Sequence, residues 1–218
     1  MPAIKCAVIA AAGIGKRLGH GIPKCLVEVA GKPIFEYQLE VLKDIPEIRM
    51  IVGFEEDQVI KSVTKIRKDV VFVRNPNFQS TSTLQSFYLG CHGLRGKVLF
   101  LDGDMIISAE SINQLLNMED DSEFIGVASD ISDDPVYAHV ENNNLVGFSF
   151  TEESPYEWAN MAYIDCQKLE YNNTHFFVQL EKFLPQKIFN IKRLEVDTFE
   201  DLEHANKVIK KFHSDLSY

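Results

Sequence analysis

The chain lacks an excess of positive charge. Its 218 residues include 22 Lys and Arg against 32 Asp and Glu, which gives a formal net charge of −10. This acidic balance argues against a nucleic-acid-binding protein, because contacts with phosphate backbones need a basic face. A single bound nucleotide is compatible with it, since a few local cations, backbone N–H groups and a metal ion can neutralise its phosphates.

Long apolar segments and paired cysteines are also missing. No apolar run approaches the roughly 20 residues that a membrane-spanning helix needs. The apolar run at residues 7–12 is interrupted at once by glycine and charge, unlike a signal peptide. The cysteines are scattered without a Cys-x-x-Cys pair, and reduced thiols are the simplest interpretation of Cys6, Cys25, Cys91 and Cys166. We therefore expect a cytoplasmic protein that binds neither membrane nor nucleic acid.

The first hundred residues contain a regular alternation of strand and helix patterns. Apolar runs typical of buried strands occur at residues 4–10, 48–54, 70–76 and 97–104. Helical spacing of apolar residues occurs between them, at residues 31–45, 55–69 and 82–94. This alternation predicts an α/β fold with a Rossmann-like, mostly parallel central sheet and helices on both faces. Ligands of such sheets lie beyond the carboxyl ends of the strands.

The second half is richer in strand patterns, and we expect it to form a smaller β extension of the same domain. Strands are predicted at residues 123–130, 135–150, 156–165 and 187–197, with a hairpin turn in the second of these. A helix is predicted at residues 166–184. The last helix begins at Thr198, where Thr198 and Asp201 have the spacing of a capping box, and ends near Phe212.

A glycine-rich stretch, AAAGIGKRLG at residues 10–19, follows the first strand and is typical of a phosphate-binding turn. Gly13 and Gly15 would let backbone N–H groups approach a triphosphate. A dinucleotide-binding fingerprint needs glycine where Leu18 stands, and a Walker-type loop needs Ser or Thr where Arg17 stands. Both interpretations fail at a chemically important residue, so a dinucleotide-dependent oxidoreductase is disfavoured.

A third pattern fits this stretch. AAGIGKRLG, followed by Pro23-Lys24-Cys25-Leu26, resembles the A-A-G-x-G-x-R-L…P-K-x-L signature of the nucleotidyltransferase family. That family includes sugar-1-phosphate nucleotidylyltransferases and bacterial CTP:phosphocholine cytidylyltransferases. The resemblance implies that Arg17 and Lys24 are catalytic cations for triphosphate oxygens. It also implies a nucleotide site that includes Ala11, Ala12, Gly13 and Gly15.

Two acidic elements match the family's metal ligands. Asp102 and Asp104, in LFLDGDMII, end an apolar strand, where buried carboxylates need a compensating cation. Mg²⁺ prefers one or two carboxylates together with substrate phosphates. The resemblance assigns Mg²⁺ to Asp104 and to Asp197, in RLEVDTFEDLEHA, and assigns Asp102 to the nucleotide site. Without the resemblance, Asp197 would be an ordinary residue at a helix N-terminus.

Hydroxyl side chains are concentrated between the glycine-rich stretch and Asp102. NPNFQSTSTLQSFYLG resembles the T-N-N-x-x-S pattern of the phosphocholine cytidylyltransferases, so the resemblance adds to the nucleotide site Thr81, Ser82, Thr83 and Ser86. Hydroxyls can bind a pyrimidine edge or phosphate oxygens, although Ser and Thr also cap helices. Two of these residues stand where the pattern has Asn, which leaves the choice of base open.

The acceptor site is predicted from TEESPYEWANMAYID, at residues 151–165. Glu157, flanked by Tyr156 and Trp158, would suit a cationic amine such as choline. The alternative is a polar loop that enters a strand whose Trp packs in the core.

Together these features predict a Mg²⁺-dependent enzyme that transfers CMP from CTP to a small phosphorylated acceptor such as phosphocholine, for cell-surface polysaccharide or lipid synthesis. The alternatives are a sugar-1-phosphate nucleotidylyltransferase and a non-catalytic nucleotide-binding regulator, and a homodimer is compatible with either. We expect one domain, residues 1–218. It divides into an NTP-binding half, an acceptor-binding half and a C-terminal helix, at residues 1–105, 106–196 and 197–218.

Overall fold

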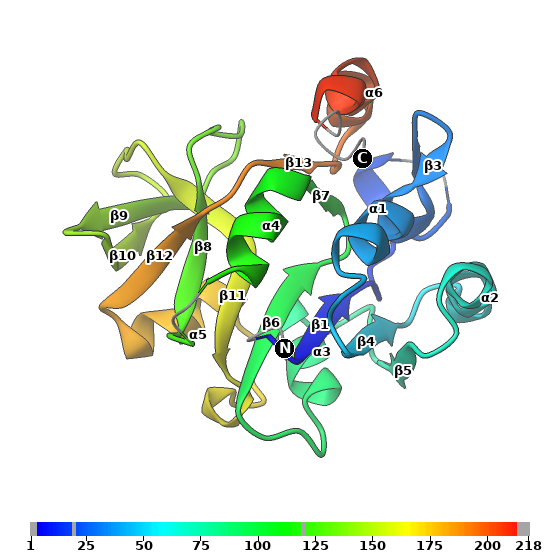
Figure 1. The fold of residues 1–218 in the computed structure, drawn as a ribbon, viewed down its shortest axis with the longest axis horizontal. Helices are drawn as coiled ribbons and strands as arrows, with labels where there is room; N and C mark the ends of the chain where they lie inside the picture. The colour runs from blue at the N-terminus through cyan, green and yellow to red at the C-terminus, as the bar shows by residue number, and fades with distance from the viewer. Residues whose placement is uncertain (1–3, 19–20, 119–120, 213–218) are drawn as a thin grey trace.

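The computed structural model describes residues 4–18, 21–118 and 121–212. Its frame is a nine-stranded sheet that runs through both halves of the chain, in the order β5-β4-β1-β6-β11-β8-β12-β10-β9 (Figure 1). The strands are β1 (Cys6–Ala10), β4 (Glu47–Val52), β5 (Val71–Arg74), β6 (Lys97–Asp102), β8 (Phe124–Ala128), β9 (Tyr137–Glu141), β10 (Asn144–Ser149), β11 (Glu157–Asp165) and β12 (Gln186–Asn190).

The sheet is mixed, whereas the alternating pattern predicted a mostly parallel one. β5, β4, β1 and β6 pair in parallel, because helical crossovers connect the strands of the first half. β11 then pairs antiparallel with both β6 and β8, and β9 and β10 form the expected hairpin. A further pairing of β11 with β9, at Glu157 and Tyr137, closes β11, β8, β12, β10 and β9 into a ring.

Helices cover both faces of the parallel part, as predicted. Residues of β1 alternate between two apolar clusters, as the two-residue period of a strand requires. Ala7 and Ile9 pack in the cluster that includes α1, α2 and α4, whereas Val8 packs in the cluster that includes α3 and α5. The helices are α1 (Ile34–Val41), α2 (Glu56–Ile66), α3 (Thr83–Gly90), α4 (Ala109–Leu116), α5 (Phe176–Leu180) and α6 (Phe199–Phe212). Single 3₁₀ turns are η1 (Lys16–Leu18), η2 (Lys24–Leu26), η3 (Cys166–Lys168) and η4 (Glu181–Phe183).

Short strands bring the end of the chain back to the first half. β7 (Met105–Ile107) follows β6 and pairs antiparallel with β13 (Arg193–Glu195), so that Glu195 lies opposite Met105. α6 then packs in an apolar cluster with the two-stranded hairpin of β2 (Glu28–Val29) and β3 (Lys32–Pro33). This return places residue 197 beside the turn that follows β6.

The structure departs from the predicted elements in several places. The strand predicted at residues 187–197 is divided into β12 and β13, and the β2–β3 hairpin was not predicted. The helix predicted at residues 166–184 is interrupted, and η3, α5 and η4 replace it. β7 and α4 were not predicted, and β7, with three residues, is too short to show a period. The capping box of α6 is confirmed, since the Thr198 N–H donates to Asp201 Oδ2 at 2.8 Å and the Asp201 N–H donates to Thr198 Oγ1 at 3.2 Å.

All four cysteines are buried free thiols. Across the described ranges, no helix combines the length and the apolar character needed to cross a membrane.

Candidate active site

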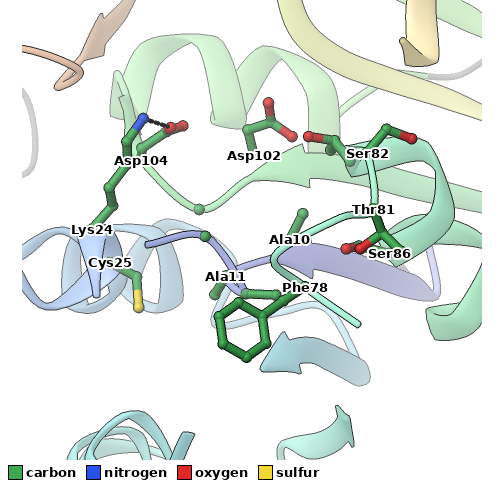
Figure 2. Close-up of a pocket in the computed structure, with 14 residues that line it drawn as sticks. Ala10, Ala11, Lys24, Cys25, Phe78, Thr81, Ser82, Ser86, Asp102 and Asp104 are labelled. Atoms are coloured by element: carbon green, nitrogen blue, oxygen red, sulfur yellow. Dashed lines mark hydrogen bonds and ion pairs between the residues drawn. The ribbon is translucent and has the colours of Figure 1, made fainter. Parts of the chain in front are cut away.

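A cavity of about 190 Å³ lies at the carboxyl ends of β1 and β6, where a ligand of this sheet was expected (Figure 2). Its lining comes from the glycine loop, the segment before and at the start of α3, and the turn after β6. The lining residues are Ala10, Ala11, Ala12, Gly13, Lys24, Cys25, Phe78, Thr81, Ser82, Thr83, Ser86, Asp102, Gly103 and Asp104. The pocket therefore gathers most of the predicted nucleotide-binding residues.

The two ends of this pocket differ in chemistry. Lys24 and Asp104 face each other at one end, whereas the hydroxyls of Thr81, Ser82 and Ser86 lie at the other (Figure 2). Asp102 lies between the two groups. One cavity thus combines a charged end with a neutral hydrogen-bonding end.

Backbone geometry explains the second glycine of the loop. Gly15 has φ +66°, and a Cβ there would lie 2.9 Å from Lys24 Cγ, so the absent side chain leaves room for the lysine. Around a Cβ at Gly13, by contrast, no described atom beyond its chain neighbours lies within 4 Å, and this edge of the pocket is open. Leu18 is buried beside α6, which accounts for its apolar character. Gly19, which ends the motif, lies outside the described residues.

Four charged side chains are linked at the charged end. Lys24 Nζ donates to Asp104 Oδ2 at 2.8 Å and also to Asp197 Oδ1. Arg17 Nη2 lies 2.6 Å from Asp197 Oδ2. The side chain of Arg17 is 63% exposed against 19% for Lys24, so Arg17 can turn toward a ligand while Lys24 is held in place. Gly15 and Arg17 are not among the lining residues of the cavity.

A third carboxylate, Glu195, joins the two predicted ones. Oxygens of Asp104, Glu195 and Asp197 all lie within 4.8 Å of one another. Asp104 Oδ1 is buried, and within the described part of the chain it has no hydrogen-bond partner. An unsatisfied oxygen among clustered carboxylates fits a hard divalent cation such as Mg²⁺. Glu195 was missed by the sequence analysis, although it stands two residues before Asp197, the spacing that puts side chains on one face of an extended chain.

The electrostatics of the cluster also favour a cation. Desolvation, and then the charges of Asp104 and Glu195, raise the pKa of Asp102 well above its ordinary value. Desolvation likewise raises the pKa of Glu195, although the Arg193 guanidinium opposes the shift. Both directions mean that these carboxylates are costly to keep ionised in the folded chain, a cost that a bound cation would reduce.

Two buried amides that the sequence analysis missed support the walls of the pocket. Gln38, on α1, donates from Nε2 to two backbone carbonyls of the β6–β7 turn, at 2.7 and 2.9 Å. Asn75, after β5, donates from Nδ2 to Thr81 Oγ1 at 2.8 Å and to Ser86 Oγ at 3.0 Å. Each residue is 1% exposed. The available signal was a polar residue within an apolar helical pattern for Gln38 and directly after an apolar strand for Asn75.

Glu157, predicted to bind the acceptor, is only 1% exposed and lies outside this cavity. One carboxylate oxygen accepts from Arg193 Nη2 at 2.8 Å. The other accepts from the N–H and the hydroxyl of Ser132, at 3.0 and 2.8 Å. Both oxygens are therefore engaged within the protein.

Trp158, the second predicted acceptor residue, is 6% exposed. Its ring packs edge-on against Phe148 and Phe176, with a centroid separation of 5.9 Å in each pair. Tyr156 is partly buried against the same apolar cluster. This is the core placement that the sequence left as the alternative.

The sequence of the chain matches known proteins over the region that lines this cavity. Residues 7–144 match the family described as MobA-like NTP transferase domain. The choline-phosphate cytidylyltransferase of Streptococcus pneumoniae is 39% identical over 88 residues, which cover 38% of each chain. The bifunctional protein GlmU of Methanococcus vannielii is 28% identical over 195 residues, which cover 83% of this chain and 44% of that protein. The chain spans less than half the length of the GlmU proteins that it matches.

Solved structures share the fold over almost the whole chain. The inositol-1-phosphate CTP transferase of T. maritima has a TM-score of 0.79 at 17% identity, over 97% of this chain and 98% of that one. The CTP:phosphocholine cytidylyltransferase of Streptococcus pneumoniae has a TM-score of 0.74 at 21% identity, over 95% of this chain and all of that one. These likenesses show the α/β, Rossmann-like fold. The chain belongs to the MobA-like NTP transferase family and carries a nucleotidyltransferase domain.

Proposed function

We propose that the chain is a Mg²⁺-dependent cytidylyltransferase, which transfers CMP from CTP to a small phosphorylated acceptor and releases pyrophosphate. The observation that carries the proposal is one pocket with hydroxyls at one end and Lys24 among carboxylates at the other. The hydroxyl end suits a base and the charged end suits phosphates. An acceptor of the phosphocholine class is suggested by the choline-phosphate cytidylyltransferase relative.

The glycine-rich stretch at residues 10–19 would leave room for the triphosphate, and cations in and after it would neutralise the phosphate charge. The Ala11 N–H is already bonded to the Ile51 carbonyl at 2.9 Å, so Ala11, with its neighbour Ala12, would serve by its small size. Gly13 borders open space, where a phosphate could approach the backbone. Lys24 and the exposed Arg17 would neutralise the oxygens.

Asp104, Glu195 and Asp197 would hold Mg²⁺, because their oxygens converge and Asp104 Oδ1 lacks a partner among the described residues. Bound there, Mg²⁺ would supply positive charge to phosphate oxygens of the donor and the acceptor. Asp102, between the charged end and the hydroxyls, would face the middle of the nucleotide. Residues 1–105 then form the NTP-binding half, and residues 106–196, with the β ring, form the acceptor-binding half.

In the reaction, a phosphate oxygen of the acceptor attacks the α-phosphorus in line. The new P–O bond forms as the bond from the α-phosphorus to the bridging oxygen breaks, and pyrophosphate leaves with that electron pair. The attacking oxygen is anionic at neutral pH, so no side chain has to remove a proton from it. Lys24 and Arg17 would position the phosphates and neutralise their charge, and these two effects dominate the catalysis of phosphoryl-type transfers.

Pyrophosphate release with each common NTP, against phosphocholine, phosphoethanolamine and several sugar 1-phosphates, tests the proposal. We expect turnover with CTP and a phosphorylated amine, and its loss in Lys24→Met. A preference for dTTP or GTP with a sugar phosphate would contradict the cytidylyl assignment. Tight CTP binding without turnover on any acceptor would favour a nucleotide-binding regulator.

A second candidate is a sugar-1-phosphate nucleotidylyltransferase. It is favoured by the GlmU relatives, one of which aligns with 83% of this chain. The same panel separates the two candidates, because this one requires a sugar 1-phosphate as the best acceptor.

A further inference from the structure

The hydrogen bonds of Asn75 fix the orientation of its amide. Asn75 Oδ1 accepts from the Asn77 N–H at 3.1 Å, while Nδ2 donates to Thr81 Oγ1 at 2.8 Å and to Ser86 Oγ at 3.0 Å. Rotating the amide by half a turn would set its NH₂ group against the Asn77 N–H, which is also a donor. Asn75 is 1% exposed, so water cannot compensate for that mismatch.

Both hydroxyls therefore receive a hydrogen bond, and each must place its own proton elsewhere. Thr81 Oγ1 donates to the Asn77 carbonyl at 3.0 Å, which uses its proton. Within the described ranges, Ser86 Oγ has no partner other than Asn75, and Ser86 lines the cavity while being 5% exposed. Of these two hydroxyls, Ser86 has the proton that is free to point into the pocket, which Ser86 lines (Figure 2).

We propose that Asn75 is a positioning residue that fixes Ser86 as a hydrogen-bond donor toward the base of the nucleotide. This inference rests on the proposed nucleotide site and deepens it, because a fixed donor selects a base edge with an acceptor atom. Cytosine has acceptors at O2 and N3, whereas uracil shares the O2 acceptor but has an N–H donor at N3. A fixed donor therefore distinguishes the two bases where it faces N3. A donor facing a donor leaves both groups unpaired in a buried place, which is strongly unfavourable.

Asn75→Asp keeps the shape of the side chain and the bond accepted from the Asn77 N–H, but it reverses the hydrogen bonds to Thr81 and Ser86, because a carboxylate only accepts. Ser86 must then donate to residue 75 and present a lone pair to the base. We expect the KM and the calorimetric Kd for CTP to rise about tenfold, with kcat changed less than about threefold. The preference for CTP over UTP should fall by a similar factor. Ser86→Ala should weaken CTP binding to a comparable extent.

The double variant separates positioning from other effects. In the Ser86→Ala background, Asn75→Asp should change the KM for CTP far less than it does in the unmodified chain, because the hydroxyl whose free proton Asn75 directs toward the base is absent. Repulsion between the new charge and the triphosphate, or general damage to the pocket, would persist in that background and overturn the proposal. An unchanged KM in Ser86→Ala would also overturn it. Asn113→Asp, on the exposed face of α4, is the matched control for an added charge.

Thermal unfolding checks that each variant is folded. If Asn75→Asp does not fold, Asn75→Ser, which adds no charge, replaces it in the double-variant comparison with Ser86→Ala. All constants are measured with the NTP that the unmodified chain binds best. A protein that prefers dTTP or GTP contradicts the proposed use of CTP, whereas the coupling between residues 75 and 86 tests the present inference by itself.

Discussion

Arg193 joins the β ring to the carboxylate cluster, and replacing it should destabilise the fold strongly. Its side chain is 7% exposed, with Nη2 2.8 Å from Glu157 Oε1 and Nη1 3.2 Å from Glu195 Oε2. Arg193→Met keeps most of the volume but leaves the buried charge of Glu157 with only the bonds from Ser132. Removing one partner of a buried ion pair costs about 3–5 kcal/mol. In a chain of this size, that cost lowers the melting temperature by about 6–20 °C.

Urea unfolding at neutral pH gives the free energies of unfolding. The expected loss arises from an unpaired charge, so Arg193→Met/Glu157→Gln should recover most of the stability lost in Arg193→Met. The neutral amide of the double variant can still bond to Ser132. If Arg193→Met loses less than about 1 kcal/mol, or if the double variant is as unstable as the single one, an unpaired charge on Glu157 does not account for the stability that Arg193 contributes.

Further predictions concern the charged end of the pocket and its support. Asp104→Asn should lower pyrophosphate release at saturating Mg²⁺ by about a hundredfold or more, and full turnover would rule out the metal assignment. Gln38→Leu leaves two carbonyls of the β6–β7 turn without their donor and should cost about 2 kcal/mol or more in urea unfolding; unchanged stability would show that the turn does not depend on Gln38. Because the pKa of Asp102 is raised in the folded chain, the folded chain keeps a proton that the unfolded chain has released. Without metal, stability should therefore rise as the pH falls through that raised pKa and level off below about pH 4. Asp102→Asn should remove this part of the pH dependence, and an unchanged slope would show that another group titrates.

Local signals were sufficient for the parallel half of the fold. β1, β4, β5 and β6, with α1, α2 and α3, each have an apolar period that depends on neighbouring residues alone. The order of strands in the second half depends instead on which distant strand pairs with which. No local pattern indicates that β11 inserts between β6 and β8, or that it also meets β9 to close a ring.

The same distinction separates the site residues that were found from those that were missed. Lys24 and Asp104 stand in short sequence motifs that can be recognised without knowledge of the fold. Gln38 holds a carbonyl 64 residues further along the chain, and Asn75 reaches a hydroxyl 11 residues away in the next helix. Glu195 lies on a strand of three residues, too short to show a period. Their roles follow from contacts that only the folded chain creates.

The predicted acceptor residues show how strand geometry limits a prediction drawn from adjacency. Tyr156, Glu157 and Trp158 are consecutive, but neighbouring residues in an extended chain point to opposite faces. Tyr156 and Trp158 accordingly pack in one apolar cluster, while Glu157 points away from it to Arg193. Tyr156 and Trp158 therefore lie on the opposite side of the chain from Glu157.

The proposed acceptor site would draw instead on β11 residues that reach the carboxylate cluster. Asn160, at φ +51°, has such a position, because its Nδ2 donates to Glu195 Oε1 at 3.1 Å. It stands three residues after Glu157, within the stretch where the pairing of β11 with β8 is irregular. The bulge breaks the two-residue alternation and turns this amide toward the charged end of the pocket. The polar residue of β11 that adjoins the proposed metal site is thus Asn160, which neither charge nor aromatic character singles out in the sequence.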